Sequence, residues 1–195
     1  MSEAHALNYL TEDEFRAYEL ASDERHEYVD GVIRAMTGAA IRHNTVALNI
    51  AFALRDASKG TGCTVTMEGA RLRINDKRHY YPDVMATCET LEHTHEINTP
   101  CLIAEVLSPT TTHIDRGEKR FAYLAMPSLR HHLIVDLEAN LIEHTSRPDA
   151  DSAWTIQICE PGHTLHLTCP ANLHITVDEL LASLKSKTPA TRSVA

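Results

Sequence analysis

The sequence has few aromatic residues, no excess of positive charge and no long apolar run. Only 5% of its 195 residues are aromatic, so a broad surface for stacking nucleic-acid bases is not expected. The formal net charge is −9, which argues against tight, sequence-independent binding of nucleic acid. No stretch approaches the ~18 apolar residues of a membrane span, and the first ten residues lack the pattern of a signal peptide. We therefore expect a soluble cytoplasmic protein with no membrane partner.

The cysteines follow no metal-binding pattern along the chain. Their number is odd, and no pair is spaced as in a zinc knuckle. Most are flanked by apolar or β-branched residues, which is typical of reduced, mostly buried thiols in a cytoplasmic protein. The histidines do not have the spacing of zinc ligands either, so no zinc site is expected. The five cysteines are Cys63, Cys88, Cys101, Cys159 and Cys169.

Hydrophobic residues make up 43% of the chain, which suits one domain with a single core. We expect this domain to span residues 1–184. Residues 185–195 are small and polar, and we expect them to form a disordered tail.

The first half of the chain has signals for helices and strands in alternation. Thr11 to Glu14 has the form of a capping box, so a short helix is expected to begin there. Residues 27–36 are typical of a strand or bent hairpin around Asp30-Gly31. Residues 40–58 have helical periodicity, with Ile41, Leu48, Ala51 and Leu54 near one face and Ala47 and Ile50 widening it. Strands are then expected at 63–67, 71–74 and 80–86, with a turn at Asn75-Asp76.

The second half begins with an apolar run and becomes rich in strands. Residues 101–107 form a mostly apolar run, typical of a central strand with both faces covered. A helix is expected at 115–125, ending before Pro127, and another strand at 132–136. Short alternating segments at 141–145, 154–159 and 164–167 indicate an antiparallel extension of the same sheet, followed by a helix at 177–184. The class indicated is mixed α+β.

Two acidic residues occupy places in this pattern where a carboxylate is unusual. Glu105 is the one acid inside the apolar strand 101–107, where a carboxylate is costly unless it is paired or bound to metal. Asp83 follows Pro82 in the preceding strand, and proline there indicates an edge or a bulge. The 22 residues between the two acids allow a loop that returns the chain beside its own strand. Either acid taken alone could be an ordinary salt-bridged carboxylate, but together they suit Mg²⁺ or Mn²⁺.

A lysine follows at the right distance to join these acids. Lys119 lies 14 residues after Glu105, in the helix that comes next, and this helix could lean back over the strand end. A lysine there could orient the attacking water or stabilise charge on a scissile phosphate. The alternative without a catalytic role is a solvated lysine on the surface of this helix.

These segments together resemble the Uma-two family of restriction endonucleases, a branch of the PD-(D/E)XK phosphodiesterases. The resemblance covers about residues 10–180, and it depends on the order and spacing of the motifs because no single motif is specific. The matching segments are His26-Glu27-Tyr28-Val29-Asp30-Gly31, Arg42-His43-Asn44, Pro82-Asp83, Glu105-Val106-Leu107-Ser108-Pro109, Asp115-Arg116-Gly117-Glu118-Lys119, Tyr123 to Leu129, and Leu133-Ile134-Val135-Asp136.

The resemblance implies a restriction-endonuclease-like core of α-β-β-β-α-β order, with a β-rich C-terminal extension. It implies metal bound by Asp83 and Glu105, with Glu27 as a third acid and the backbone carbonyl of Val106 as a further ligand. The parent motif has lysine two residues after the glutamate, where this chain has Leu107, so Lys119 is the lysine that would take over. His43 matches the family segment Arg-His-Asn. It could contact phosphate or lie beside Glu27, or be a neutral packed histidine.

The function that follows is metal-dependent endonuclease cleavage of DNA. Two rival interpretations stay open: the same fold as a catalytically inactive binding or regulatory module, and an interaction protein that assembles through residues 141–167. DNA contact would need local basic residues, and a homodimer would suit the two strands of a duplex. Two basic groups could flank one cleft: Arg71, Arg73, Lys77 and Arg78; and Arg116, Lys119 and Arg120.

Overall fold

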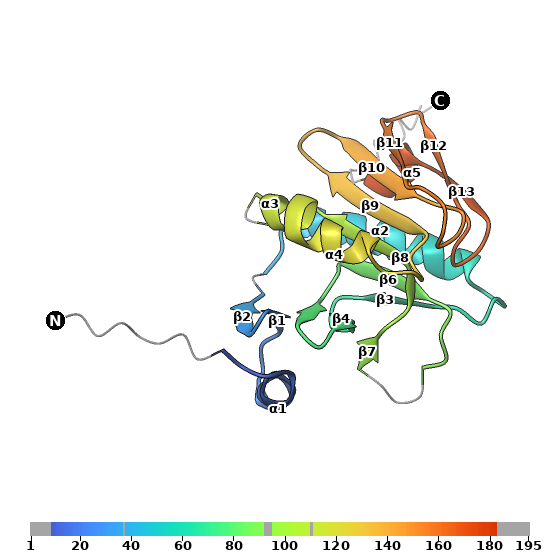
Figure 1. The fold of residues 1–195 in the computed structure, drawn as a ribbon. Helices are drawn as coiled ribbons and strands as arrows, with labels where there is room; N and C mark the ends of the chain where they lie inside the picture. The colour runs from blue at the N-terminus through green and yellow to red at the C-terminus, as the bar shows by residue number, and fades with distance from the viewer. Residues whose placement is uncertain (1–8, 37, 92–94, 110, 183–195) are drawn as a thin grey trace, which may run out of the picture.

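The computed structural model describes residues 9–36, 38–91, 95–109 and 111–182 (Figure 1). Within these residues, no helix has both the length and the apolar character needed to cross a membrane. A six-stranded sheet forms the centre, with strand order β11-β10-β9-β8-β6-β3. Its strands are β3 (Thr64–Met67), β6 (Val84–Thr87), β8 (Pro100–Val106), β9 (His131–Asp136), β10 (Leu141–Ser146) and β11 (Thr155–Cys159).

Two smaller sheets complete the β structure of the described residues. A five-stranded sheet has the order β2-β1-β5-β4-β7, and β12 pairs with β13 in a separate hairpin. The five strands are β1 (His26–Val29), β2 (Val32–Ala35), β4 (Arg71–Asn75), β5 (Arg78–Tyr80) and β7 (Glu96–Ile97). The hairpin consists of β12 (Thr164–Leu167) and β13 (Leu173–Thr176).

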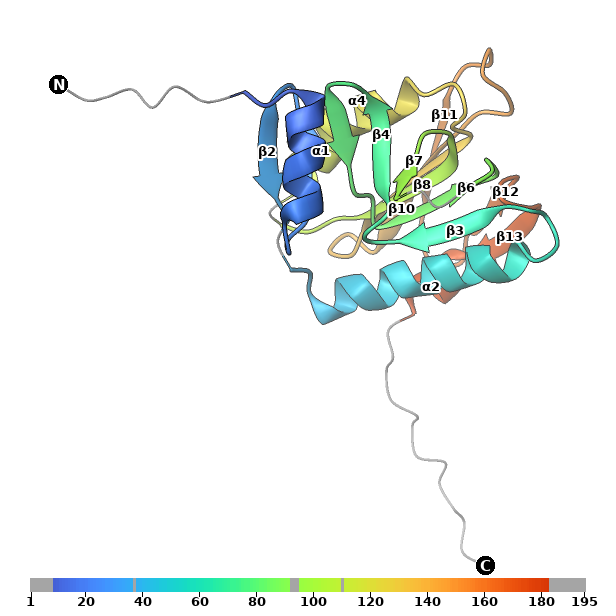
Figure 2. The ribbon, with the colours of Figure 1, turned by 90° about the horizontal axis from the view of Figure 1, so that it is seen from below.

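Helices cover both faces of the central sheet. Figure 2 shows α2 along one face, beside β3, and α4 on the other side. Along the central sheet the chain runs α2, β3, β6, β8, the helical segment with α4, then β9, while β4, β5 and β7 belong to the five-stranded sheet. The expected mixed α+β class is confirmed. The helices are α1 (Glu12–Ala21), α2 (Ile41–Ala57), α3 (Thr112–Ile114), the π-helix η1 (Asp115–Lys119), α4 (Arg120–Leu124) and α5 (Val177–Leu181).

The capping box of α1 and the turn between β1 and β2 are present as the sequence predicts. The Thr11 hydroxyl accepts from the Glu14 backbone N–H, and the Glu14 carboxylate accepts from Thr11 in return, which completes the capping box of α1. Such a cap contributes about 1 kcal/mol. Asp30 and Gly31 have φ values of 50° and 93°, as a two-residue hairpin turn requires, and they join β1 to β2.

Side chains of β8 alternate between two apolar clusters. Leu102, Ala104 and Val106 pack with α2, whereas Ile103 packs with α4. Glu105 follows the same alternation and therefore lies on the α4 side. Apolar side chains thus pack against both faces of β8, and this packing fixes the position of Glu105.

Several predicted elements differ from the structure. The single strand expected at 80–86 is divided between β5 and β6, which belong to different sheets, with residues 81–83 crossing between them. Ile41 and Leu48 on α2 are exposed at 86% and 57%, so their expected place on the buried face is wrong. The other four predicted residues, Ala47, Ile50, Ala51 and Leu54, are buried as expected, together with Val46, because α2 covers the sheet with one stripe only.

The C-terminal part differs in one further way. Strands β10 and β11 extend the central sheet as predicted, but the segment 164–167 pairs only with β13 and not with that sheet. The helix predicted at 115–125 is present and begins earlier, at Thr112. The predicted disordered tail lies outside the described residues.

The cysteines also differ from the expectation of reduced thiols. Cys63 is joined to Cys88 and Cys101 to Cys169 by disulfides. Cys159 alone is free and buried, as expected. Spacing along the chain could not reveal these pairs, because each partner lies on a separate strand or loop.

Candidate active site

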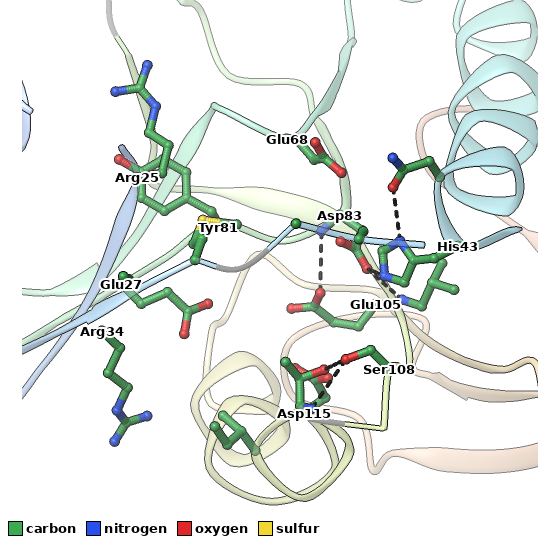
Figure 3. Close-up of a pocket in the computed structure, with 18 of the residues that line it drawn as sticks. Arg25, Glu27, Arg34, His43, Glu68, Tyr81, Asp83, Glu105, Ser108 and Asp115 are labelled. Atoms are coloured by element: carbon green, nitrogen blue, oxygen red, sulfur yellow. Dashed lines mark hydrogen bonds and ion pairs between the residues drawn. The ribbon is translucent and has the colours of Figure 1, made fainter. Parts of the chain in front are cut away.

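A cleft of about 900 Å³ opens where the central sheet meets β1, η1 and the start of α2. Figure 3 shows Glu27, Asp83 and Glu105 extending into this space from three separate segments. Six carboxylates line the cleft against three cationic side chains, so it carries an excess of negative charge. The acids are Glu24, Glu27, Glu68, Asp83, Glu105 and Asp115; the cations are Arg25, Arg34 and Lys119.

Asp83 and Glu105 form the centre of the cleft. Val84 pairs with Ala104 in the β6–β8 register, so the preceding Asp83 lies opposite Glu105 at the end of the antiparallel pair. The Asp83 carboxylate accepts from the Val106 backbone N–H at 2.7 Å, and the Asp83 N–H donates to Glu105 Oε2 at 3.3 Å. Backbone groups therefore fix both acids side by side.

Lys119 reaches into the same region from η1. Its Nζ lies 2.7 Å from Glu27 Oε1, 3.2 Å from Asp115 Oδ1 and 3.5 Å from Glu105 Oε1. Burial alone would lower the pKa of Lys119, but these carboxylates raise it well above its usual value. The ammonium is therefore charged. A π-turn changes the phase of the helix, and such turns are frequent at functional sites.

Glu105 is the most strongly perturbed acid of the cleft. Burial raises its pKa well above the ordinary range; Lys119 works in the opposite direction, while Asp83 and Asp115 raise the pKa further. The Tyr123 hydroxyl donates to Glu105 Oε1 at 2.7 Å. A carboxylate held this way has a strong tendency to take up a proton or a cation.

His43 begins α2 beside Asp83. Its Nε2 lies 3.2 Å from Asp83 Oδ2. Burial lowers the pKa of His43, but the hydrogen bond and the charge of Asp83 outweigh this and raise it overall. His43 thus lies beside Asp83, whereas one reading of the sequence had put it beside Glu27.

The sequence-predicted residues all line this one cleft: Glu27, His43, Asp83, Glu105, Val106 and Lys119. Among the described residues, however, no three acids or histidines of the cleft bring ligand atoms within 4.8 Å of one another. Lys119 lies among Glu27, Glu105 and Asp115 and neutralises part of their charge. Asp83 and Glu105 are thus the two acids that lie side by side, whereas Glu27 forms an ion pair with Lys119.

Two residues of the site were not predicted from the sequence. Asp115 is 2% exposed and pairs with Lys119 one turn later on the helix, and Tyr123 holds Glu105. The spacing of four residues between Asp115 and Lys119 is a usable signal for an ion pair on a helix. Nothing in the sequence indicates the Tyr123 contact, because it joins a helix to a strand 18 residues away.

Of the two basic groups that could have flanked one cleft, only Lys119 lines it among the described residues. Arg73 pairs with Glu12, and Arg71 pairs with Glu96. Arg116 and Arg120 both pair with Glu143 on β10. The charges of these arginines are therefore partly neutralised, and their ion pairs join strands and helices to one another away from the cleft.

The fold has a counterpart among solved structures. A crystal structure described as a putative nuclease belonging to DUF820, from Anabaena variabilis, matches with a TM-score of 0.71. The match covers 88% of this chain and 97% of that chain at 16% identity, so it establishes a shared fold. The chain therefore has the same fold as that structure, which is described as a putative nuclease.

Sequence comparison gives the family. The model of the Uma2 family, described as "Putative restriction endonuclease", matches residues 12–178, and the chain belongs to this family. Two proteins of Synechocystis are similar to it. The uncharacterized protein slr1290 is 32% identical over 161 residues, covering 81% of this chain and 84% of that protein. The uncharacterized protein sll1609 is 29% identical over 152 residues, covering 75% and 85%.

Proposed function

We propose that the chain is a metal-dependent nuclease that hydrolyses phosphodiester bonds in DNA, with Mg²⁺ or Mn²⁺ as its cofactor. The observation that carries the proposal is the Asp83–Glu105 pair, fixed across the ends of β6 and β8 in an acidic cleft beside Lys119. The family description and the nuclease-like fold support the same activity.

The donor set of the cleft fits a hard divalent cation. All the acids offer oxygen ligands, which Mg²⁺ and Mn²⁺ prefer. Burial raises the pKa of Glu105, and adjacent Asp83 raises it further because the two carboxylates repel each other in the absence of a cation. Asp83 and Glu105 would hold the ion, together with the carbonyl of Val106. Glu27 would join as the third acid once its contact with Lys119 is relaxed.

The negative charge of the cleft is a second reason to expect a metal, because a bound cation would be needed to attract phosphate. Six carboxylates against three cations would repel a DNA strand, so the chain's own charges do not attract the substrate. When bound, the ion supplies Lewis-acid activation of a water and of the phosphate. The acidic cleft is therefore compatible with DNA only as a metal-loaded site.

The remaining side chains orient the reactants. Lys119 is charged and held by Glu27 and Asp115, so it can neutralise charge that develops on the phosphate. Tyr123 fixes Glu105, and His43 fixes Asp83 from the side of α2. His43 is thus a positioning residue. We further infer that the protein acts as a homodimer, since duplex cleavage needs one site for each strand.

The test is cleavage of supercoiled plasmid by the purified chain with Mg²⁺, with Mn²⁺ and with a chelator. Nicking that depends on metal and disappears in Asp83→Asn supports the proposal. Calorimetric titration with Mn²⁺ measures metal binding separately from activity. Light scattering of the protein with and without DNA reports the dimer.

The control variant is Glu138→Gln, which removes an exposed carboxylate at the β9–β10 turn, away from the cleft. It should nick at the wild-type rate. Metal-independent nicking, or equal activity in Asp83→Asn, contradicts the proposal. Metal binding without cleavage of DNA or RNA would favour the inactive module.

A further inference from the structure

Four cysteines meet at the end of the central sheet that lies away from the acidic cleft. The sulfur atoms of Cys88, Cys101 and Cys169 all lie within 4.8 Å of one another, and Cys63 is bonded to Cys88. None of the four lines the cleft. Cys101 is four residues from Glu105 on β8, a separation of about 13 Å along a strand.

The backbone explains why these four residues converge. Thr64 pairs with Thr87 and Thr87 with Pro100, so Cys63, Cys88 and Cys101 follow one another across the ends of β3, β6 and β8. Cys169 arrives from the segment after β12, and the Cys63 sulfur lies 3.6 Å from the Pro170 carbonyl oxygen. Four separate segments thus deliver one sulfur each.

We propose that these four cysteines, in their reduced form, hold a structural Zn²⁺ ion. In a tetrahedral site with Zn–S bonds of about 2.3 Å, the sulfurs lie about 3.8 Å apart. Two independent disulfides need no closeness between the pairs, whereas Cys88 of one pair lies within 4.8 Å of both sulfurs of the other. Contact between the pairs is what a common ion requires, and four thiolates leave no open position on it.

The reduced form follows from where the chain would act. Cellular DNA lies in compartments that keep thiols reduced, and there disulfides are rare. This step rests on the proposed action on DNA. The two disulfides and the zinc site are then oxidised and reduced states of the same four sulfurs.

The conversion between these states balances with an ordinary thiol reductant. Two reductant thiols give two electrons and two protons to each disulfide, which yields two cysteine thiols and one reductant disulfide. Binding of Zn²⁺ then displaces the four thiol protons into solvent.

The ion would join the C-terminal hairpin to the central sheet. The hairpin β12–β13 shares no strand pairing with that sheet and contacts it through apolar side chains such as Leu165 and Leu167. A metal bridge between Cys169 and the three sheet cysteines would add a fixed connection, so the role is structural and separate from hydrolysis.

The first test counts thiols and zinc in the full chain, purified with a reductant and without chelator. We expect one Zn²⁺ per chain, and all five cysteines titrating as thiols after the protein is denatured with a chelator. One titrating thiol without zinc, the count left by two disulfides, overturns the proposal. Five thiols that take up no added Zn²⁺ overturn it equally.

Replacing Zn²⁺ with Co²⁺ identifies the ligands. Four thiolates give intense sulfur-to-cobalt charge-transfer absorption and the visible bands of a tetrahedral ion, which carboxylates do not give. Absence of charge-transfer absorption in the reduced wild-type protein contradicts a cysteine site, even if a variant fails to fold.

Matched variants separate this site from the acidic cleft. Cys88→Ser, at an exposed position, should weaken the charge-transfer absorption, because one thiolate ligand is lost, and lower the Tm, whereas Cys159→Ala should keep the full absorption. Asp83→Asn should keep one Zn²⁺ per chain while losing nuclease activity. Failure of the nuclease proposal would leave these zinc measurements unchanged. An absorption of undiminished wild-type intensity in Cys88→Ser contradicts the assignment.

Discussion

Two clusters of charged side chains differ in their balance of charge. In the cleft, Lys119 is the one cation in contact with Glu27, Glu105 and Asp115 among the described residues. Beside α1, Glu12 and Glu96 are surrounded by three arginines, which we call the arginine network: Arg16, Arg71 and Arg73 pair with these two acids.

The difference appears in the pKa values. Hydrogen bonds from Arg73 lower the pKa of Glu12 to about 2, whereas burial raises that of Glu105 above its usual range. An acid with a lowered pKa is stabilised by its surroundings and stabilises the fold in turn. The raised pKa of Glu105 shows that burial and the neighbouring acids outweigh the contacts it receives from Lys119 and Tyr123. The arginine network therefore serves stability, and the cleft has a surplus of negative charge available for a ligand.

The largest effect is expected for Asp83→Asn. Loss of one metal ligand should lower metal-dependent nicking by at least about 10³-fold. Stability without metal should stay equal or rise, because a like charge beside Glu105 is removed. Rates on supercoiled plasmid and thermal melting with a chelator check both parts. A large fall in Tm would show that Asp83 stabilises the fold, as Glu12 does.

Lys119→Met should reduce nicking by about 10²-fold, since a cation that stabilises phosphate charge is lost. It should also tighten Mn²⁺ binding, because Glu27 is released from its 2.7 Å ion pair. Titration calorimetry measures the affinity, and Lys59→Met, at an exposed lysine, serves as control. Weaker Mn²⁺ binding in Lys119→Met would show that the lysine supports the metal site.

Glu12→Gln should act in the opposite sense, by lowering stability with little change in activity per folded molecule. Arg16 and Arg73 would each lose a charged partner, and we expect a loss of about 1–2 kcal/mol. Asp13→Asn removes an exposed acid from the same helical turn and should be nearly neutral. Urea unfolding of both variants measures the difference; equal stabilities would mean that the arginine network contributes little.

A smaller effect, on stability at low pH, is expected from His132, whose ring has no charged partner among the described residues. It is buried against Tyr123, and neither ring nitrogen has a hydrogen-bond partner among the described residues. Burial, with a smaller effect from Arg120, lowers its pKa to about 3. The unfolded chain, with a histidine pKa of about 6.5, therefore binds more protons, and stability falls as the pH drops from about 6.5 towards 3.

His132→Phe should lessen that fall by up to about 1.4 kcal/mol per pH unit within this window. Part of the slope should remain, because burial also lowers the pKa of His131 to about 3 and of His144 to about 4. Unfolding curves at several pH values, with exposed His113→Phe as control, test this. An unchanged slope in His132→Phe would assign the acid sensitivity to other groups.

Local chemistry made much of the fold predictable. The capping box at Thr11, the turn at Asp30-Gly31 and the apolar run of β8 each depend on neighbouring residues only, and each is present in the structure. The exposed Ile41 and Leu48 were mispredicted because periodicity gives a face and does not say how much of it a sheet covers. The split of residues 80–86 between two sheets was missed for a similar reason: alternation does not record which sheet a strand joins.

The sequence by itself determined most of the helices and strands, the family, and the acids and lysine that line one cleft, because spacing and order are properties of the chain. Only the tertiary structure decided that Lys119 lies among Glu27, Glu105 and Asp115 and that Tyr123 holds Glu105. It also brought together the sulfurs of Cys88, Cys101 and Cys169, with Cys63 bonded to Cys88. These contacts arise where separate strands and helices pack together. Their distances depend on register and crossing geometry, which no local pattern of residues encodes.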